Sequence, residues 1–291
     1  MAERTGVIHD IGYRGYDGPR EGTGALALTL YVTGLRHAFG LGRSGRSKVL
    51  PFLLLGLGVV PAVIVVGVVT MVRLNSLPVS YAAYLGQIQM LVTLFAAAQA
   101  PVLFSRDLRH RSIVLYLARP LPPALFALTR WASLASAILV FTLLPTLVLY
   151  GGGLLAGLDT GDETPVFLRS VALQLMLAAL LAGITGLISS VALRRGFAVV
   201  ASILALIVVA GVVLIVQEIA AYEGIEAVGE IAGLFSPWAL HNGLAQAWEA
   251  GGRSTIVLTD AWAWTYLATA LVVCAACLAL LVRRFVKVGS R

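Results

Sequence analysis

The sequence predicts an all-α, polytopic membrane protein with six transmembrane helices. Hydrophobic residues make up 59% of the chain and charged residues only 12%, whereas soluble domains have about 45–50% and about 25%. The apolar residues also gather in long runs, each able to cross a hydrocarbon core of about 30 Å at about 1.5 Å per residue. The six predicted spans cover residues 49–72, 81–104, 131–157, 170–193, 197–217 and 261–282.

Residues 1–48 form a polar, Gly-rich and basic segment before the six-span domain of residues 49–291. No apolar core precedes Val49, so we expect no cleavable signal peptide. Within this segment the pattern of residues 25–39 predicts a helix, because apolar residues recur at spacings of four, three and four. That helix is too short to span, so we expect an amphipathic helix in the inner membrane interface; a helix packed on the protein is the alternative. The residues of this stripe are Leu28, Val32, Leu35 and Phe39.

The linker from Gly40 to Lys48 resembles two nucleotide-binding loops. Its glycines fit G-x-G-x-x-G, and Arg46 stands where a P-loop has lysine. Both motifs bind phosphate only where a strand leads into the loop and a helix follows it. No strand is predicted here, so we expect a flexible basic linker and no ATPase site. The spans also lack paired carboxylates, His clusters and a nucleophile beside a base, so we expect no enzyme active site and no bound cofactor or metal.

The basic residues favour every second connector between the spans. Of the 21 Lys and Arg residues, all except Arg73, Arg169 and Arg253 lie in the N-terminal segment, the second and fourth connectors and the C-terminal tail. The positive-inside rule then predicts a multi-pass protein of the cell membrane with both termini in the cytoplasm. Since the basic residues flank apolar runs, we expect them to meet lipid headgroups rather than nucleic acid.

The spans themselves hold almost no ionisable side chains. The polar residues inside them include uncharged glutamines, and Pro61, Pro101 and Pro145 are the candidate kink positions; the glutamines are Gln87, Gln89, Gln99 and Gln174. A carrier driven by protons or sodium usually needs an acidic residue or a broken helix at mid-membrane. Neither is evident in the sequence, which argues against that class.

The cytoplasmic connector between spans two and three carries the most informative segment. Residues 106–117 predict a short helix with mixed apolar and basic faces, which Pro120 ends. Such a helix is suited to docking on a cytosolic partner; a solvated helix held at the membrane surface by lipid headgroups is the alternative. The residues that we expect to dock or to fix the exit angle are Arg106, Asp107, Leu108, Arg109, Arg111, Ser112, Leu115, Arg119 and Pro120.

This connector resembles that of the permease subunits of ABC-2 type (type V) ABC transporters. The order of its basic, Ser, Leu and Arg-Pro positions is similar, although the common glycine before Ser112 is Arg111 here. The stretch Leu234–Trp248, with Ser-Pro near its start, and the opening Ile8–Arg20 also resemble that family. The resemblance implies that residues 106–117 are a coupling helix and residues 25–39 a connecting helix. It further implies short re-entrant or interfacial helices before the last span.

The resemblance implies a permease subunit of an ATP-driven exporter. The partners would be two ABC ATPase subunits, which carry ATP and Mg, together with a second permease copy or paralogue and membrane lipids. The outer gate region would include Pro237, Trp238 and His241; an interfacial aromatic belt, with the histidine hydrogen-bonded or solvated, is the alternative. A different function, a non-transport sensor or assembly module that recruits a cytosolic protein through the same connector, also fits the residues. The substrate is not indicated.

Overall fold

The computed structural model describes residues 21–105, 121–192 and 194–289, and this part of the chain is helical without strands, with 82% helix. Five helices are long and apolar enough to cross a membrane, and a bent pair makes a sixth candidate. The all-helical, multi-span fold predicted from hydropathy is therefore confirmed. The five are α2 (Arg46–Val72), α7 (Pro123–Leu155), α8 (Thr160–Val191), the continuous segment Arg195–Tyr222, and α13 (Asp260–Gly289).

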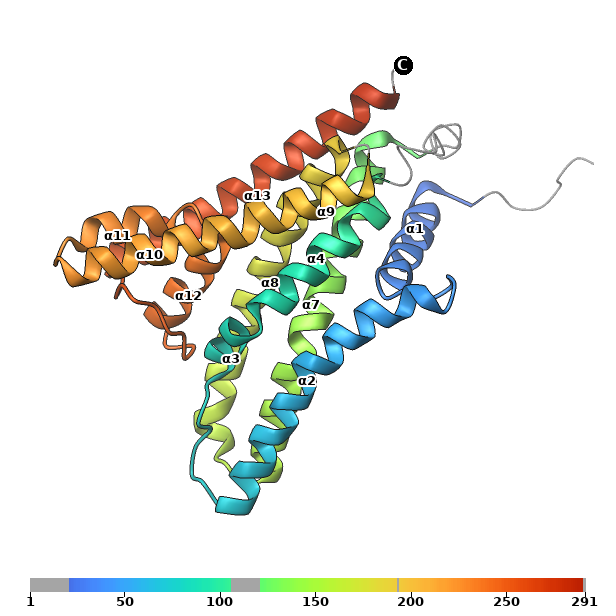
Figure 1. Cartoon of the computed structure of the whole chain (residues 1–291). Coiled ribbons are helices and arrows are strands. Elements are labelled where there is room, and N and C mark those ends of the chain that lie inside the picture. The colour runs from blue at the N-terminus through green and yellow to red at the C-terminus, as the bar shows by residue number, and fades with distance from the viewer. Residues whose placement is uncertain (1–20, 106–120, 193, 290–291) are drawn as a thin grey trace, which may run out of the picture.

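Figure 1 shows a bundle that opens toward one side. Helices α2, α7 and α8 run side by side with α4 (Gln89–Leu103), and α1 (Thr23–Ala38) packs alongside the first part of α7 at one end of this group. The fifth and last spans diverge from the group. The angle between the two groups is occupied by α12 (Pro237–Ala247), which packs on both α8 and α13.

The second span is broken. Helix α3 (Tyr81–Gln87) and α4 meet at Ile88 with a bend of 65°. The expectation that no span is broken was therefore wrong, and Pro61, Pro101 and Pro145 lie inside continuous helices instead of at the break. Both halves pack on α7 and α8, but different side-chain bonds hold them: the Tyr84 hydroxyl of α3 donates to the Gly58 carbonyl of α2 at 2.6 Å, whereas Thr93 of α4 accepts from Trp238 of α12.

The fifth span contains a turn of π-helix. It runs through α9 (Arg195–Ile203), η1 (Leu204–Val208) and α10 (Val209–Tyr222). Gly224, at φ 71°, reverses the chain, and α11 (Glu226–Gly233) returns beside α10. Two side chains fix this return: Gln217 Nε2 donates to the Gly229 carbonyl at 3.2 Å, and the Tyr266 hydroxyl donates to the Glu230 carbonyl at 2.8 Å. Two short helices thus precede the last span.

Aromatic rings and small residues fill the centre of the bundle. Phe95 of α4 stacks on Phe141 of α7 with ring centroids 4.6 Å apart. Close approach between α8 and α13 depends on Gly183, because a Cβ there would lie 3.0 Å from the Cβ of Cys277. Packing of this kind, with small residues where helices approach, is how membrane helices gain van der Waals contact.

Candidate functional site

The break in the second span lies beside a cavity of about 190 Å³. Three parts of the chain form it: the start of α4, one face of the η1–α10 segment, and the first turns of α12. Apolar walls predominate, and four uncharged polar side chains interrupt them. The lining residues are Gln89, Ile207, Ala210, Gly211, Val213, Leu214, Gln217, Ser236, Trp238, Ala239 and Asn242.

Local capping chemistry positions α12 at this cavity. Ser236 precedes the helix with extended backbone, and its hydroxyl accepts a hydrogen bond from Ala239 N at 3.4 Å. Pro237 follows at the first helical position, where its missing N–H costs nothing. Trp238 is then directed inward: it is buried, and its indole N–H donates to Thr93 Oγ1 of α4 at 3.2 Å. This bond ties the gate region predicted from sequence to α4, the second helix of the bent pair.

His241 lies one turn further along α12 and is completely buried. Its Nδ1 is 3.1 Å from Asn242 Oδ1; because an amide oxygen only accepts, Nδ1 carries the proton and donates. Nε2 is left without a hydrogen-bond partner among the described residues. Burial lowers the pKa of His241 to about 4, and the bond to Asn242 opposes this shift only in part. The imidazole is therefore neutral near pH 7.

The structure separates the aromatic residues of this region into a buried pair and a more exposed pair. Trp238 and His241 lie inside the protein, with ring centroids 6.4 Å apart. Trp248 and Trp264 form a separate edge-to-face pair at 6.2 Å, and Trp264 is 64% exposed. A solvated His241 is therefore excluded by its burial, whereas an interfacial position of Trp248 and Trp264 stays a prediction.

Helix α1 packs on the protein through a face that the sequence pattern did not mark. Leu30, Gly34 and Ala38 are buried, and the Tyr31 hydroxyl donates to Ser136 Oγ of α7 at 2.8 Å. Of the predicted apolar stripe, Phe39 is buried and Leu35 is half-buried, while Leu28 and Val32 are exposed. One face thus rests on α7, and two residues of the stripe remain free to meet lipid. The predicted role of α1 as a connecting helix stays a prediction.

The predicted docking residues, Arg106 to Pro120, lie outside the described part of the chain. The structure brings together a different set: Gln89 and Gln217 from two spans with Ser236 and Asn242 from α12. Gln89 stood out in the sequence as a polar residue inside a span, but nothing in the local pattern paired it with Gln217. Within the described residues no group of three His, Cys, Asp or Glu side chains could hold a metal ion.

The arrangement is suited to binding rather than to bond chemistry. Amide and hydroxyl groups can orient a ligand by hydrogen bonds, while Trp238 and the apolar wall bury its carbon surface. No ionised side chain lines this cavity, so it offers no countercharge to an ion. No protein-family model matches the chain, and no curated protein matches it.

Proposed function

We propose that this chain is the membrane-spanning permease subunit of an ATP-driven ABC-2 type exporter. The observation that carries the proposal is the cavity at the break between α3 and α4. A broken span can change its bend without unfolding a continuous helix, and this one borders a site with few, uncharged polar groups. The proposed substrate is accordingly a neutral molecule with a large apolar part.

Energy would enter from a separate ATPase. The glycine linker joins α1 directly to α2, and Gly40 and Gly42 have φ of 71° and 76° in the turn between them. A phosphate-binding loop instead needs a strand before it. Packing alone accounts for the glycine at position 40, because a Cβ there would collide with the Ser47 carbonyl. ATP and Mg would therefore bind on two partner subunits that dock on residues 106–117, with a second permease copy or paralogue completing the complex.

A test of this function uses the full chain co-expressed with the ABC ATPase that the proposal assigns to it and reconstituted in vesicles. Arg109→Glu with Arg111→Glu should leave insertion intact and weaken ATPase binding about a hundredfold, because reversing a charge at a docking surface can cost about 2.7 kcal/mol. Arg73→Glu, which changes an exposed residue after α2, should do neither. Full partner binding and full ATP-dependent transport in the double variant would contradict the proposal.

The break at Ile88 also favours a second candidate, a carrier driven by an ion gradient. Broken helices hold coupling ions in such proteins, and Glu230 of α11 supplies a buried carboxylate. Burial, followed by the charge of Glu226, raises the pKa of Glu230, as a proton-coupled group requires. The two candidates separate in vesicles: transport that a pH gradient drives without ATP, and that Glu230→Gln abolishes, would select the carrier.

A further inference from the structure

A second cavity lies at the boundary of the predicted fourth span, where Arg169 lines it. Arg169 is the last charged residue before a run of 24 uncharged residues, 170–193, in the sequence. An arginine at the end of such a run lies at the level of lipid headgroups, with its stem along the apolar surface. Trp248 and Trp264, the residues predicted for a membrane interface, belong to the same part of the molecule. Arg169 and the two tryptophans are thus two independent indications that this cavity lies at the depth of the lipid headgroups.

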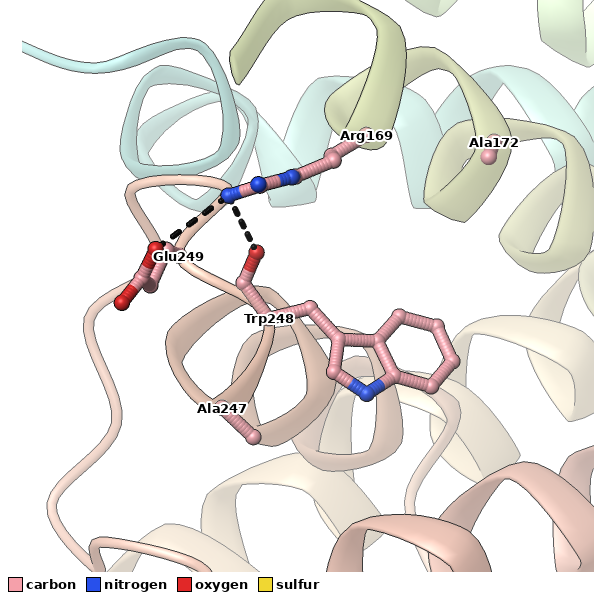
Figure 2. A pocket seen from close by; sticks show the side chains of 5 residues that line it. All are labelled: Arg169, Ala172, Ala247, Trp248 and Glu249. Carbon is pink, nitrogen blue, oxygen red and sulfur yellow. Dashed lines mark hydrogen bonds and ion pairs between the residues drawn. The ribbon is translucent and has the colours of Figure 1, made fainter. Parts of the chain in front are cut away.

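The cavity has a volume of about 410 Å³ and opens widely at the surface. Figure 2 shows its two ends: the Arg169 guanidinium and the Glu249 carboxylate meet at one, while the Trp248 indole and Ala172 lie on the side away from Glu249. Ala247 completes the lining. The site is thus amphipathic, with a cation and an anion at one end and carbon surface at the other.

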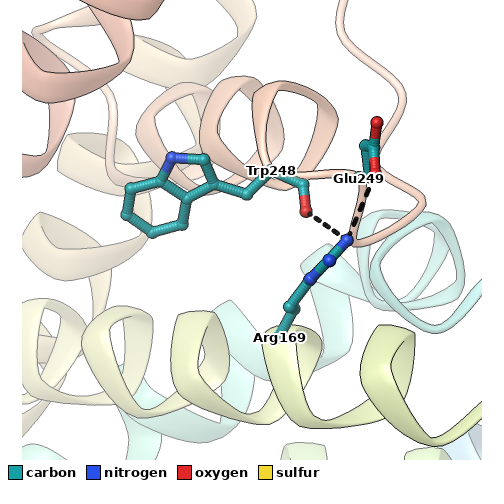
Figure 3. Close-up of polar contacts among 3 residues, drawn as sticks. All are labelled: Arg169, Trp248 and Glu249. Atoms are coloured by element: carbon teal, nitrogen blue, oxygen red, sulfur yellow. Dashed lines mark hydrogen bonds and ion pairs between the residues drawn. The ribbon is translucent and has the colours of Figure 1, made fainter.

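One nitrogen of Arg169 makes both hydrogen bonds at the polar end of the cavity. Figure 3 shows that Nη1 donates both to the Trp248 carbonyl, at 3.2 Å, and to Glu249 Oε2, at 3.4 Å. A guanidinium has five N–H donors, so Nε and Nη2 remain for an anionic group. The side chains of Arg169 and Glu249 are 47% and 86% exposed, and exposed ion pairs of this kind contribute little to stability. Both charges can therefore be shared with a ligand.

Helix termination alone does not explain Glu249. It follows the last turn of α12 with φ at 51°, a left-handed conformation that glycine adopts without strain. A carboxylate is also unfavourable near the negative end of a helix dipole. Glycine would avoid both costs. The carboxylate of Glu249 therefore stands at a position where backbone strain and the helix dipole disfavour it. An observed outlier of this kind points to a function.

We propose that this cavity binds the headgroup of a zwitterionic phospholipid. Nε and Nη2 of Arg169 receive the phosphate, because a guanidinium fork matches phosphate oxygens. The Glu249 carboxylate receives the ammonium group, and the acyl chains lie along Ala172, Ala247 and the Trp248 indole. Glu249 disfavours an anionic lipid that has no amine, and the apolar end disfavours a soluble phosphoester. The proposal does not depend on what the protein transports.

The test measures lipid retention by native mass spectrometry on the purified full chain. The probes are phosphatidylethanolamine and phosphatidylglycerol with identical acyl chains, and glycerophosphoethanolamine, which has the headgroup alone. We expect phosphatidylethanolamine to bind about tenfold more tightly than phosphatidylglycerol, which corresponds to about 1.4 kcal/mol. Glu249→Gln should remove this preference, and Arg169→Gln should weaken both lipids. The charge-matched controls Glu223→Gln and Arg253→Gln change exposed residues outside the cavity and should do neither.

Glu249→Gly separates binding from folding. It relieves the left-handed strain, so the variant should be as stable as the parent chain or more stable, and it should still lose the preference for phosphatidylethanolamine. Three results would overturn the proposal: equal binding of the two lipids by the parent chain, a preference that survives in Glu249→Gly, or displacement of the lipid by an equal concentration of glycerophosphoethanolamine.

Discussion

The central helices α7 and α8 differ from the outer helices α2 and α9–α10 in how much of their apolar surface is buried. In α7 and α8, 50% and 56% of the residues in the most apolar stretch are buried, compared with 22% in α2 and 17% in the fifth span. Yet the outer helices are the more apolar ones. High hydropathy therefore marks the exposed surface of the bundle, and it does not mark the centre of the protein.

The central pair is held by small and polar residues. Gln174 of α8 donates to Thr146 Oγ1 of α7 at 2.9 Å, and Gly186 allows α8 to approach the ring of Phe104. The outer helices instead leave their side chains bare: Leu57 and Ile64 of α2 are 52% and 60% exposed. Without a hydrophobic driving force between helices in lipid, close packing and interhelical hydrogen bonds hold the centre together.

The largest effect that this comparison predicts is the loss of stability when a glycine of the central pair is replaced by a larger residue. A Cβ on Gly186 would lie 3.0 Å from the Phe104 ring, whereas a Cβ on Gly67 of α2 would have nothing within 4 Å. Gly186→Leu should therefore cost about 3 kcal/mol, the upper end of the usual range for overpacking. Gly67→Leu should cost nothing measurable. The measurement is thermal unfolding of the detergent-solubilised chain, followed by size-exclusion chromatography.

Equal losses of stability in the two variants would contradict the difference in packing between the central pair and α2. That result would mean that the bare face of α2 is covered by protein in the functional assembly. Such a covered face would also shield Gly67 from lipid, and a change of oligomeric state in Gly67→Leu would show it directly.

A smaller effect should follow from the buried imidazole of α12. The pKa of His241 is lowered to about 4, against 6.5 in an unfolded chain, so the unfolded state binds more protons between these values. The stability contributed by the neutral ring is then complete above about pH 6.5 and falls as the pH drops toward 4. Between pH 7.5 and pH 5.5 the loss should be about 1.4 kcal/mol.

The measurement for His241 is the difference in melting temperature between the two pH values, compared with that of His241→Phe. The variant should lose the part of the pH dependence that this ring contributes, while other titrating groups act equally in both proteins. An unchanged pH dependence in His241→Phe would show that the ring is hydrated.

The smallest effect concerns the polar contact between the central helices. Gln174 Nε2 also lies 3.3 Å from Ser170 Oγ, while Gln174 Oε1 has no partner among the described residues. A double-mutant cycle of Gln174→Leu and Thr146→Val should therefore give a coupling of about 0.6 kcal/mol, typical of such bonds in membranes. The cycle is read from unfolding in mixed micelles. Zero coupling would leave small-residue packing as the whole explanation of the centre.

The sequence was sufficient to place the six apolar runs, because hydropathy averages over about twenty residues. It did not predict that α7 begins at Pro123 or that α8 begins at Thr160, since polar residues continue a helix beyond the hydrocarbon. It also missed the break at Ile88. The residues Gly86–Gln89 contain no proline, the residue by which the sequence marked its candidate kinks.

The candidate cavity was even less predictable. Its polar residues are uncharged and spread over three elements, so no spacing along the chain joins Gln89 to Gln217. Trp238 could be singled out as an aromatic near the outer side, but only packing determines which face of α12 turns inward. The Arg169–Glu249 pair, 80 residues apart, carries no local signal at all.

The π-turn η1 affects how homologous sequences align with the fifth span. A turn with i→i+5 bonding holds one more residue than the α-turns around it, so every later residue of this span is rotated by about 100° relative to an uninterrupted helix. The cavity face from Ile207 to Gln217 lies at or beyond that turn. A single-codon deletion within 204–208 that turned this segment into regular α-helix would therefore leave the later residues facing the cavity as they do now. A homologue of the same length with an uninterrupted helix would instead present a different wall to the cavity, at almost the same composition and hydropathy.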